Sequence, residues 1–480
     1  MSKFTERFQE IQQEQGFTIA AVCKKAKLER TLVHKMIKGD RHPDKAVLNA
    51  FLAKAMLSHS QMQELQTLYE IEVVGEATYR ARLQIAQLFS RIDVLSKAQS
   101  SVLAQEVDTP VNLDYLGQQQ AFQGAFQGEM LFERWAAYAV QNSQQLSLFL
   151  PSHCHSFFNA LIRIYATTPR TLEIQHIFAL EKRHQKASVN LDIFSQLMPL
   201  ALLRKDGYHP QFFYADTHAL ADHFTPMPYY CFDEESVLMI GEDFTQVIFS
   251  KEPDVLQLYR QHFANTKANT IPFLTVQTSF DNLIQGYHQG DFTGAALRIS
   301  YEAQPCIGQF ITRELVDSYV NQALPQREFL VDSISKMYMD MHTNAPLRAS
   351  FFSDKGLHTF ATTGVVRYFP TSIVPALRPD TRVYFLQCIK DSILRDEQSF
   401  YAIKESSLCV PDLVSCEVFE GGHISFHLND SHFPHVFYMS ESSVVDALMD
   451  FFHSLKTAPT VYGKEETLDL IDTCIQLAQE

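Results

Sequence analysis

A short run of cationic and hydrogen-bonding residues near the start of the chain has the composition of a surface that reads nucleic-acid bases. Its members are spaced so that one helix would expose them together: Arg30, Thr31, His34 and Lys35. Arginine and lysine donate hydrogen bonds to guanine acceptors in the major groove, and a threonine can contact the thymine methyl group. We therefore expect these four side chains to contact base edges of double-stranded DNA.

Further polar and basic residues flank this row and suit the phosphate backbone, whose contacts position a protein on the duplex. These residues are Thr18, Lys24, Lys25, Lys38 and Arg41. The first 60 residues hold 11 Lys or Arg and 6 Asp or Glu, a net charge of +5, whereas the whole chain carries -15. The rest of the chain therefore carries -20, so the attraction for phosphate is concentrated in one N-terminal module.

Two short helices must present these side chains, and the sequence marks where each begins and ends. Thr18 can cap the first helix, whose inner face we assign to residues 20–23, and Glu29 can open the second helix. In the second helix, the apolar residues recur at the spacing of a buried face; they are Leu32, Val33, Met36 and Ile37. Gly39 ends that helix, and Pro43 prevents its early resumption. Two such helices joined by a tight turn form a helix-turn-helix.

Residues 4–58 resemble the Cro/CI-type helix-turn-helix of the xenobiotic-response-element (XRE) family of transcriptional regulators. The resemblance rests on the Thr18 start, Leu28-Glu29, the exit from Ile37 to Pro43, and a following helix with Val47, Leu48, Phe51, Leu52 and Ala53. The exit is similar to the family's E-x-G-x-R-x-P segment, with Ile37 where an acidic residue is usual. Ile19 stands where many members carry a phosphate-contacting glutamine. The resemblance implies sequence-specific DNA binding.

The chain is too long for a single hydrophobic core, because it has 480 residues. We predict a multidomain α+β protein. Its parts are an all-α helix-turn-helix domain at 1–60, a helical connector and linker at 61–129, and α/β sensory subdomains at 130–270 and 271–480. Gly75 is expected to divide the connector into two helices.

The last two thirds of the chain alternate between strand and helix patterns, which is typical of an α/β fold. Residues 382–388 are predicted as a strand and residues 277–289 as a helix. Residues 247–252 and 437–442 resemble each other, since each run ends a strand and precedes a helix. This echo indicates a body of two related halves.

Other residue clusters could carry chemistry, but their spacing argues against it. His153-Cys154-His155 offers zinc-ligand types, yet neighbouring residues on a helix point in different directions. His184-Gln185-Lys186 with Asp192 comes near the H-x-K-x4-D pattern of phospholipase-D-like enzymes, but the aspartate is one residue late and no second H-x-K occurs. We therefore predict no catalytic residue, no metal and no cofactor, and the protein is not expected to be an enzyme.

The body also contains aromatic residues that could line a ligand pocket or simply form core. They are Phe212, Phe213, Tyr214, Tyr229, Tyr230, Tyr338, Phe351 and Phe352. The pattern does not separate these two roles, so no ligand contact is assigned. Apolar runs fall short of a membrane span, the N-terminus lacks a signal core, and the eight cysteines are scattered, all of which favour the cytoplasm.

The sequence thus favours a homodimeric, sequence-specific transcriptional regulator whose large C-terminal region senses a small-molecule or peptide effector or mediates oligomerisation. One alternative is a DNA-tethered enzyme or a degenerate phospholipase-D-like protein. Another is a protein-interaction hub in which the N-terminal module binds protein instead of DNA.

Overall fold

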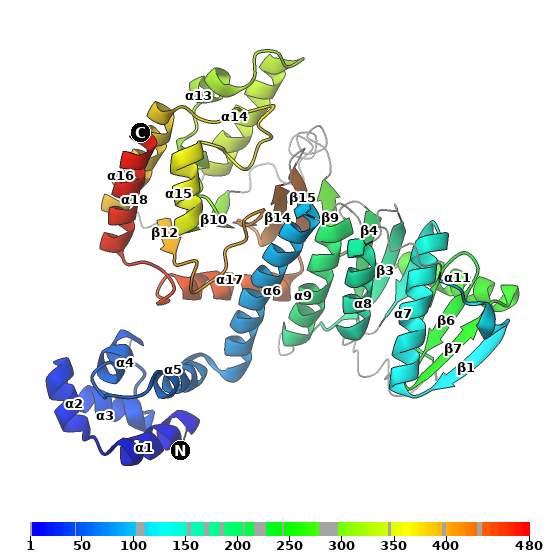
Figure 1. Ribbon diagram of the computed structural model, residues 1–480, viewed down its shortest axis with the longest axis horizontal. Helices are drawn as coiled ribbons and strands as arrows, with labels where there is room; N and C mark the ends of the chain where they lie inside the picture. The colour runs from blue at the N-terminus through cyan, green and yellow to red at the C-terminus, as the bar shows by residue number, and fades with distance from the viewer. Residues whose placement is uncertain are drawn as a thin grey trace. The chain divides into compact units, whose positions relative to one another are not determined.

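The computed structural model divides the chain into two compact units, Met1–Gln84 and Ile85–Glu480 (Figure 1). It describes residues 2–43, 45–101, 111–150, 155–167, 172–182, 187–204, 207–215, 227–241, 244–277, 296–343, 347–395, 400–429 and 434–480. The fold is multidomain α+β with a helical N-terminus, as the sequence predicted. Within the described residues, no helix has both the length and the hydropathy that crossing a bilayer requires.

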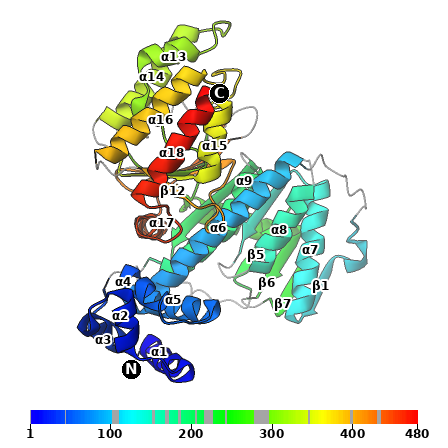
Figure 2. The same cartoon turned by 60° about the vertical axis from the view of Figure 1, so that its left-hand side comes forward.

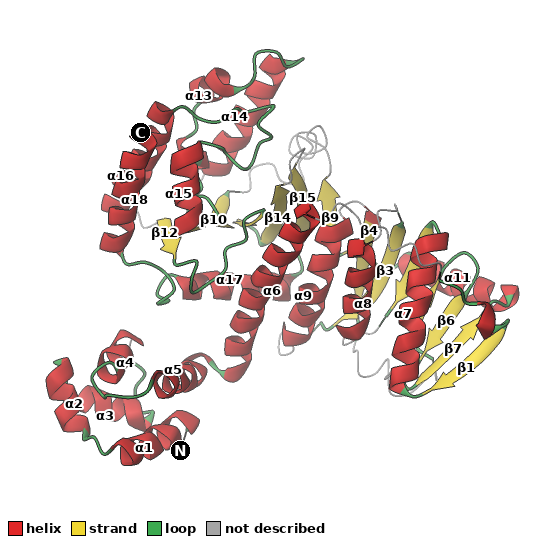
Figure 3. Ribbon diagram, viewed as in Figure 1, coloured by secondary structure: helices red, strands yellow, loops and turns green. Residues whose placement is uncertain are grey.

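The first unit is built from helices alone (Figure 3). These are α1 (Lys3–Gln15), α2 (Ile19–Ala26), α3 (Arg30–Lys38), α4 (Lys45–Leu52), α5 (His59–Val74) and the start of α6 (Glu76–Ser101). One apolar core joins them, and its fully buried members include Phe8, Val33, Met36, Leu48 and Phe51. Gly75, with φ of 86°, separates α5 from α6 as predicted.

The second unit contains two mixed sheets, and the first of them, sheet 1, has the strand order β1-β7-β6-β5-β2-β3-β4-β8. The strands are β1 (Gln119–Gln123), β2 (Gln145–Phe149), β3 (Glu173–Leu180), β4 (Tyr208–Tyr214), β5 (Tyr229–Phe232), β6 (Val237–Ile240), β7 (Gln246–Ser250) and β8 (Ile271–Pro272). Helices α7 (Ala125–Asn142), α8 (His155–Thr167) and α9 (Ala187–Arg204) lie along one face of this sheet (Figure 2). Helix α11 (Pro253–Lys267) packs on the other face.

Sheet 2 has the order β12-β11-β10-β13-β14-β15-β9. Its strands are β9 (Thr275–Gln277), β10 (Leu297–Glu302), β11 (Ala349–Ser353), β12 (Phe400–Ile403), β13 (Val414–Phe419), β14 (His423–Asn429) and β15 (Pro434–Met439). Its helices are α13 (Arg313–Tyr319), α14 (Arg327–Thr343), α15 (Asp354–Thr363), α16 (Pro379–Leu394), α17 (Ser442–Leu455) and α18 (Lys464–Gln479). Helices α14, α15, α16 and α18 enclose an apolar core against one face, and α17 packs on the other.

The two sheets share one topology. In each, three parallel strands run β2-β3-β4 or β10-β11-β12, and the first of these also pairs antiparallel with β5 or β13. A meander of three antiparallel strands follows, and an edge strand, β1 or β9, closes each sheet. The two similar runs of sequence, residues 247–252 and 437–442, lie where β7 leads into α11 and where β15 leads into α17. The body therefore consists of two halves with the same strand order, and β8 is an addition to the first.

Some predicted elements differ from the structure. Residues 382–388 lie inside α16, where Phe385, Leu386, Ile389 and Ile393 are buried at helical spacing. Pro379 starts that helix, so the aromatic and β-branched residues that favoured a strand instead face a helical core. The glutamine-rich stretch before residue 130 contains β1, which gains its order from pairing with β7. The helix predicted at 277–289 falls almost wholly outside the described residues.

Candidate nucleic-acid interface

Helix α3 separates its side chains into a buried face and an exposed face. Val33, Met36 and Ile37 are buried in the core of the first unit. The other face carries the residues that the sequence assigned to bases and one assigned to phosphate: Arg30, Thr31, Lys35 and Lys38 are exposed and His34 is half-buried. The structure therefore brings the predicted base-contacting side chains together on one surface.

Three hydrogen bonds from other elements hold α3 and its flanking loops. The Thr5 hydroxyl in α1 donates to the Ile37 carbonyl at 2.6 Å, and this contact is buried. The Tyr69 hydroxyl in α5 donates to the Pro43 carbonyl at 2.6 Å and fixes the chain that leaves α3. Before α3, the Leu28 amide donates to the Cys23 carbonyl at 3.0 Å. The orientation of α3 is therefore set by contacts on both of its sides.

The turn and the caps follow the sequence prediction closely. Thr18 caps α2, since its hydroxyl accepts from the Ala21 amide at 3.3 Å. Glu29 occupies the N-cap of α3, and Gly39 ends that helix at φ of 76°. One assignment is wrong: within residues 20–23 only Val22 and Cys23 are buried, because the alanines before them lie on the outer side of α2.

The residues assigned to phosphate also lie on the surface. Lys24 and Lys25 are exposed in the last turn of α2, and Lys38 and Arg41 are exposed on either side of Gly39. Lys27, to which the sequence assigned no contact, is exposed in the turn at φ of 55°. The signal that could have identified it is its position between two other basic residues.

Charge is segregated within the first unit. Residues 24–41 hold seven basic and two acidic residues, whereas α1 and α5 together hold two basic and six acidic residues. One of those two basic residues, Arg7, is paired with Glu10 and Glu64 at 2.9 Å. The positive charge of the unit is thus concentrated on α2, α3 and the turns beside them.

Two side chains of the interface touch each other. Arg30 Nε donates to His34 Nε2 at 3.2 Å, across one turn of α3. The guanidinium keeps its remaining N–H groups for an outside acceptor, since no further hydrogen bond ties them within the described residues. An oriented guanidinium on a helix surface suits the two acceptors on a guanine edge.

The other candidate motifs lie largely outside the described residues. His153 and Cys154 are outside them, and so are His184, Gln185 and Lys186. Asp192 is half-buried within α9. Among the described residues, no group of His, Cys, Asp and Glu side chains has an arrangement that could hold a metal ion.

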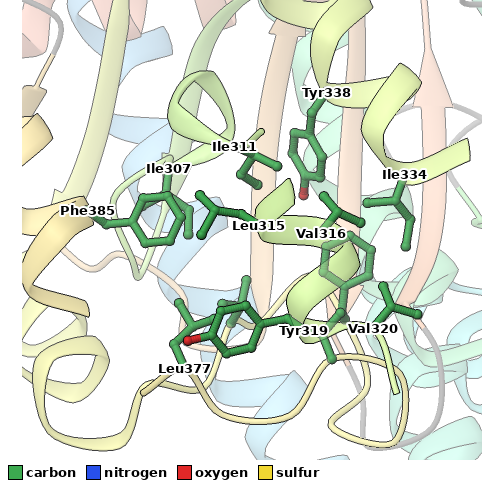
Figure 4. Close-up of a pocket in the computed structure, with 13 residues that line it drawn as sticks. Ile307, Ile311, Leu315, Val316, Tyr319, Val320, Ile334, Tyr338, Leu377 and Phe385 are labelled. Carbon is green, nitrogen blue, oxygen red and sulfur yellow. The ribbon is translucent and has the colours of Figure 1, made fainter. Parts of the chain in front are cut away.

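A pocket of about 450 Å³ of empty volume, part of it open to solvent, lies in the second half of the body (Figure 4). Its wall is almost wholly apolar, with side chains from α13, α14 and α16 and from the connecting segments, such as Val316, Ile334 and Phe385. Of the aromatic residues that the sequence singled out, Tyr338 lines this pocket. Phe351 and Phe352 are fully buried in β11 and belong to the core.

Comparison with known proteins gives little. No protein-family profile and no curated protein matches the chain. A solved structure of TrmBL2, described as an archaeal chromatin protein with a novel mode of DNA binding, is 12% identical, with a TM-score of 0.24 over 44% of this chain and 69% of that chain. Polyphosphate kinase from Porphyromonas gingivalis is 9% identical, with a TM-score of 0.23 over 78% of this chain and 60% of that chain. Likenesses this weak carry no argument about function.

Proposed function

We propose that this protein is a sequence-specific DNA-binding transcriptional regulator of the XRE type. The observation that supports the proposal is the exposed face of α3, where Arg30, Thr31 and Lys35 stand together above a fully apolar buried face. A recognition helix reads base edges with the residues near its N-terminus, and these three lie in its first two turns.

The flanking charges fit the same role. Lys24, Lys25, Lys38 and Arg41 border the exposed face of α3, and we assign them to phosphates on either side of the major groove. Thr18 would contact phosphate from the start of α2. Negative charge on α1 and α5 disfavours binding through those helices, so the duplex is expected on the α2–α3 side alone.

A single short recognition helix covers few base pairs. We propose that two copies bind a pseudo-palindrome, with their α3 helices about 34 Å apart in successive major grooves. The body of the protein would mediate this dimerisation or respond to an effector that changes the spacing of the two modules.

The experiment selects a preferred duplex for the full chain from a random library and measures affinity by fluorescence anisotropy at several salt concentrations. Arg30→Ala combined with Lys35→Ala should weaken binding to the selected duplex by at least about 30-fold, because each good base contact contributes about 1–3 kcal/mol. Lys3→Ala, which removes one positive charge from α1, serves as the control and should change affinity less than threefold.

Salt dependence separates DNA binding from the protein-hub alternative. Phosphate contacts impose a steep fall of affinity with salt, and each lost phosphate contact lowers the slope by about one unit. Lys25→Ala should therefore reduce the slope without altering sequence preference. Selection of no preferred duplex, or unchanged affinity in the Arg30/Lys35 double variant, would refute the assignment of α3.

A further inference from the structure

A row of polar side chains crosses the interior of sheet 2. Side chains directly opposite one another on paired strands share a face of the sheet. The row, in strand order from β11 to β15, is Ser350, Ser300, Glu417, Ser425 and Tyr438. The first four are at most 5% exposed. Buried polar groups cost free energy unless they are paired, so a whole row of them needs an explanation.

Sheet 1 provides an internal comparison. The equivalent row lies on the face of sheet 1 that the helices following β2 and β3 cover. Its members are His176, Leu148, Cys231, Leu238 and Phe249. Only His176 in that row is strongly polar; its Nδ1 lies 2.8 Å from the Tyr208 hydroxyl, and its Nε2 has no hydrogen-bond partner among the described residues. Because the same topology is stable with an apolar row, the fold itself does not require the polar row of sheet 2.

The polar row is extended by two residues further along the same face, Glu302 and His427, and by Tyr368 from a connecting segment. Tyr368 donates a hydrogen bond to Glu302 Oε2, and its ring lies 5.9 Å from the imidazole of His427. His427 Nε2 is 3.0 Å from Glu417 Oε2 and 2.8 Å from Ser425 Oγ. We call these three residues and the row together the polar face of sheet 2. Hydrogen bonds join Ser300 to Ser350 and Tyr368 to Glu302, and a third group connects Glu417, Ser425 and His427.

One carboxyl oxygen of Glu302 lacks a hydrogen-bond partner among the described residues. The residue is 4% exposed, and the oxygen concerned is Oε1. Burial raises its pKa to about 8; hydrogen bonding with Tyr368 and Ser300 opposes this rise, and the charge of Glu417 adds to it. Arg367 lies near this end of the sheet, but its guanidinium is bound to Asp412. Two carboxyl groups therefore share the polar face with one imidazole, and a cation is the group that would complement them.

The apolar pocket adjoins this polar face through Tyr338. Its ring lines the pocket, and its hydroxyl points toward Val316 in Figure 4. Burial raises the pKa of this hydroxyl, and the nearby Cys306, Glu417 and Glu302 raise it further. Ile307 and Phe369 in the pocket wall each follow a residue that is bonded to the polar face or belongs to it, since the Cys306 amide donates to Ser350 Oγ at 3.0 Å and Tyr368 donates to Glu302 Oε2.

We propose that the second half of the body binds a small organic amine, whose ammonium group pairs with Glu302 on the polar face while its apolar part fills the adjoining pocket. Tyr338 separates the two regions and must rotate to join them. The ammonium group gives Glu302 Oε1 its partner and takes the place of the proton that Glu302 carries at pH 7. An anion of the same size is excluded, because it would face two buried carboxyl groups.

The test compares three probes of matched shape on the full chain by isothermal titration calorimetry: phenethylamine, 2-phenylethanol and phenylacetate. Phenethylamine should bind at least tenfold more tightly than 2-phenylethanol, and phenylacetate should not bind. At pH 7 the amine should displace close to one proton from Glu302, which is measured as a dependence of the binding enthalpy on the ionisation enthalpy of the buffer.

Glu302→Gln should reduce phenethylamine affinity at least tenfold and abolish proton release, while leaving 2-phenylethanol binding unchanged. Glu328→Gln, on the exposed side of α14, is the matched control and should bind like the wild type. Equal affinity for amine and alcohol, absence of binding by the amine at 10 mM, or an unaffected Glu302→Gln variant would each overturn the proposal. The three-probe comparison on the wild type decides the question even if the variant does not fold.

Discussion

Arg30 Nε donates a 3.2 Å hydrogen bond to His34 Nε2, so two residues assigned to base contacts restrain each other before any DNA is bound. A side chain held in place loses less conformational entropy on binding than a free one. His34→Ala should therefore weaken binding to the preferred duplex by about 3–10-fold, since Arg30 must then be ordered by the DNA. Anisotropy titrations on the preferred duplex and on a scrambled duplex measure this effect.

The comparison with Arg30→Ala distinguishes orientation from direct contact. Removing Arg30 should cost about 10–100-fold, because a base contact is lost with it. Binding to the scrambled duplex should change little in His34→Ala, since it depends on phosphate contacts. A larger loss for His34→Ala than for Arg30→Ala would show that His34 itself makes the main base contact.

Two positions with positive φ in the first unit predict opposite effects on stability. Gly39 ends α3 at φ of 76°, and a Cβ there would lie 2.9 Å from Glu72 Oε1. Gly39→Ala should destabilise the unit by about 1–2 kcal/mol because of the left-handed backbone, while the end of the flexible Glu72 side chain can move aside. Lys27 adopts φ of 55° in an exposed turn, so Lys27→Gly should stabilise the unit by about 0.5 kcal/mol.

Amide hydrogen exchange of peptides from α1 to α4, measured in the full chain, reports on this unit separately from the body. Exchange should be faster in Gly39→Ala and slower in Lys27→Gly. Peptides from sheets 1 and 2 provide the control, because neither substitution touches them. Unchanged exchange in Gly39→Ala would mean that the end of α3 relaxes without cost.

Local signals account for the success of the sequence prediction in the first unit. Thr18, Gly39 and Gly75 each mark an end through a property of a single residue, such as a capping hydroxyl or access to positive φ. The echo between residues 247–252 and 437–442 was likewise a local pattern, and it falls on equivalent strands of two sheets with one topology.

The polar face of sheet 2 could not be predicted from such local signals. Ser300, Ser350 and Glu417 are separated by many residues, and only the strand order and register place them in one row. Each of these residues alone looks like any other position in a short strand. The register that aligns them depends on how the strands pair with distant segments. The strand predicted for residues 382–388 was wrong for a related reason, because the core against which these residues pack decides between helix and strand.

His176 in β3 should make the body less stable in acid. It is 1% exposed, and burial lowers its pKa from 6.5 to about 3. The folded protein keeps this imidazole neutral, whereas the unfolded chain gains a proton below pH 6.5, so stability falls as the pH falls from 6.5 toward 3. Between pH 7 and pH 5 the expected loss is about 2 kcal/mol.

Urea unfolding of wild type and His176→Gln at both pH values measures this loss. Glutamine cannot be protonated and can still bond the Tyr208 hydroxyl, so the variant should lose about 2 kcal/mol less than the wild type on acidification. His358→Gln, in α15, is a control that should show the wild-type response. Parallel pH dependence in wild type and His176→Gln would show that the imidazole is protonated in the folded protein.

Glu302 should have the opposite pH dependence, because burial and the charge of Glu417 raise its pKa from 4.5 to about 8. The folded protein retains this proton when the unfolded chain has lost it. Its contribution is therefore fully present below pH 4.5 and is lost as the pH rises toward 8. At pH 7 the unfavourable term reaches about 3 kcal/mol, so Glu302→Gln should be more stable than the wild type by about that amount.

The two proteins should differ by only about 0.4 kcal/mol near pH 4.5, where the wild-type carboxyl group is protonated in the folded state and half protonated in the unfolded chain. Urea unfolding at pH 4.5 and pH 7 measures the difference, and Glu328→Gln on the surface of α14 should stay within 0.5 kcal/mol of the wild type at both. A stabilising substitution at a buried residue identifies a side chain that the fold does not need, which is the expected behaviour of a residue kept for binding. A less stable Glu302→Gln at pH 7 would instead make Glu302 a structural residue.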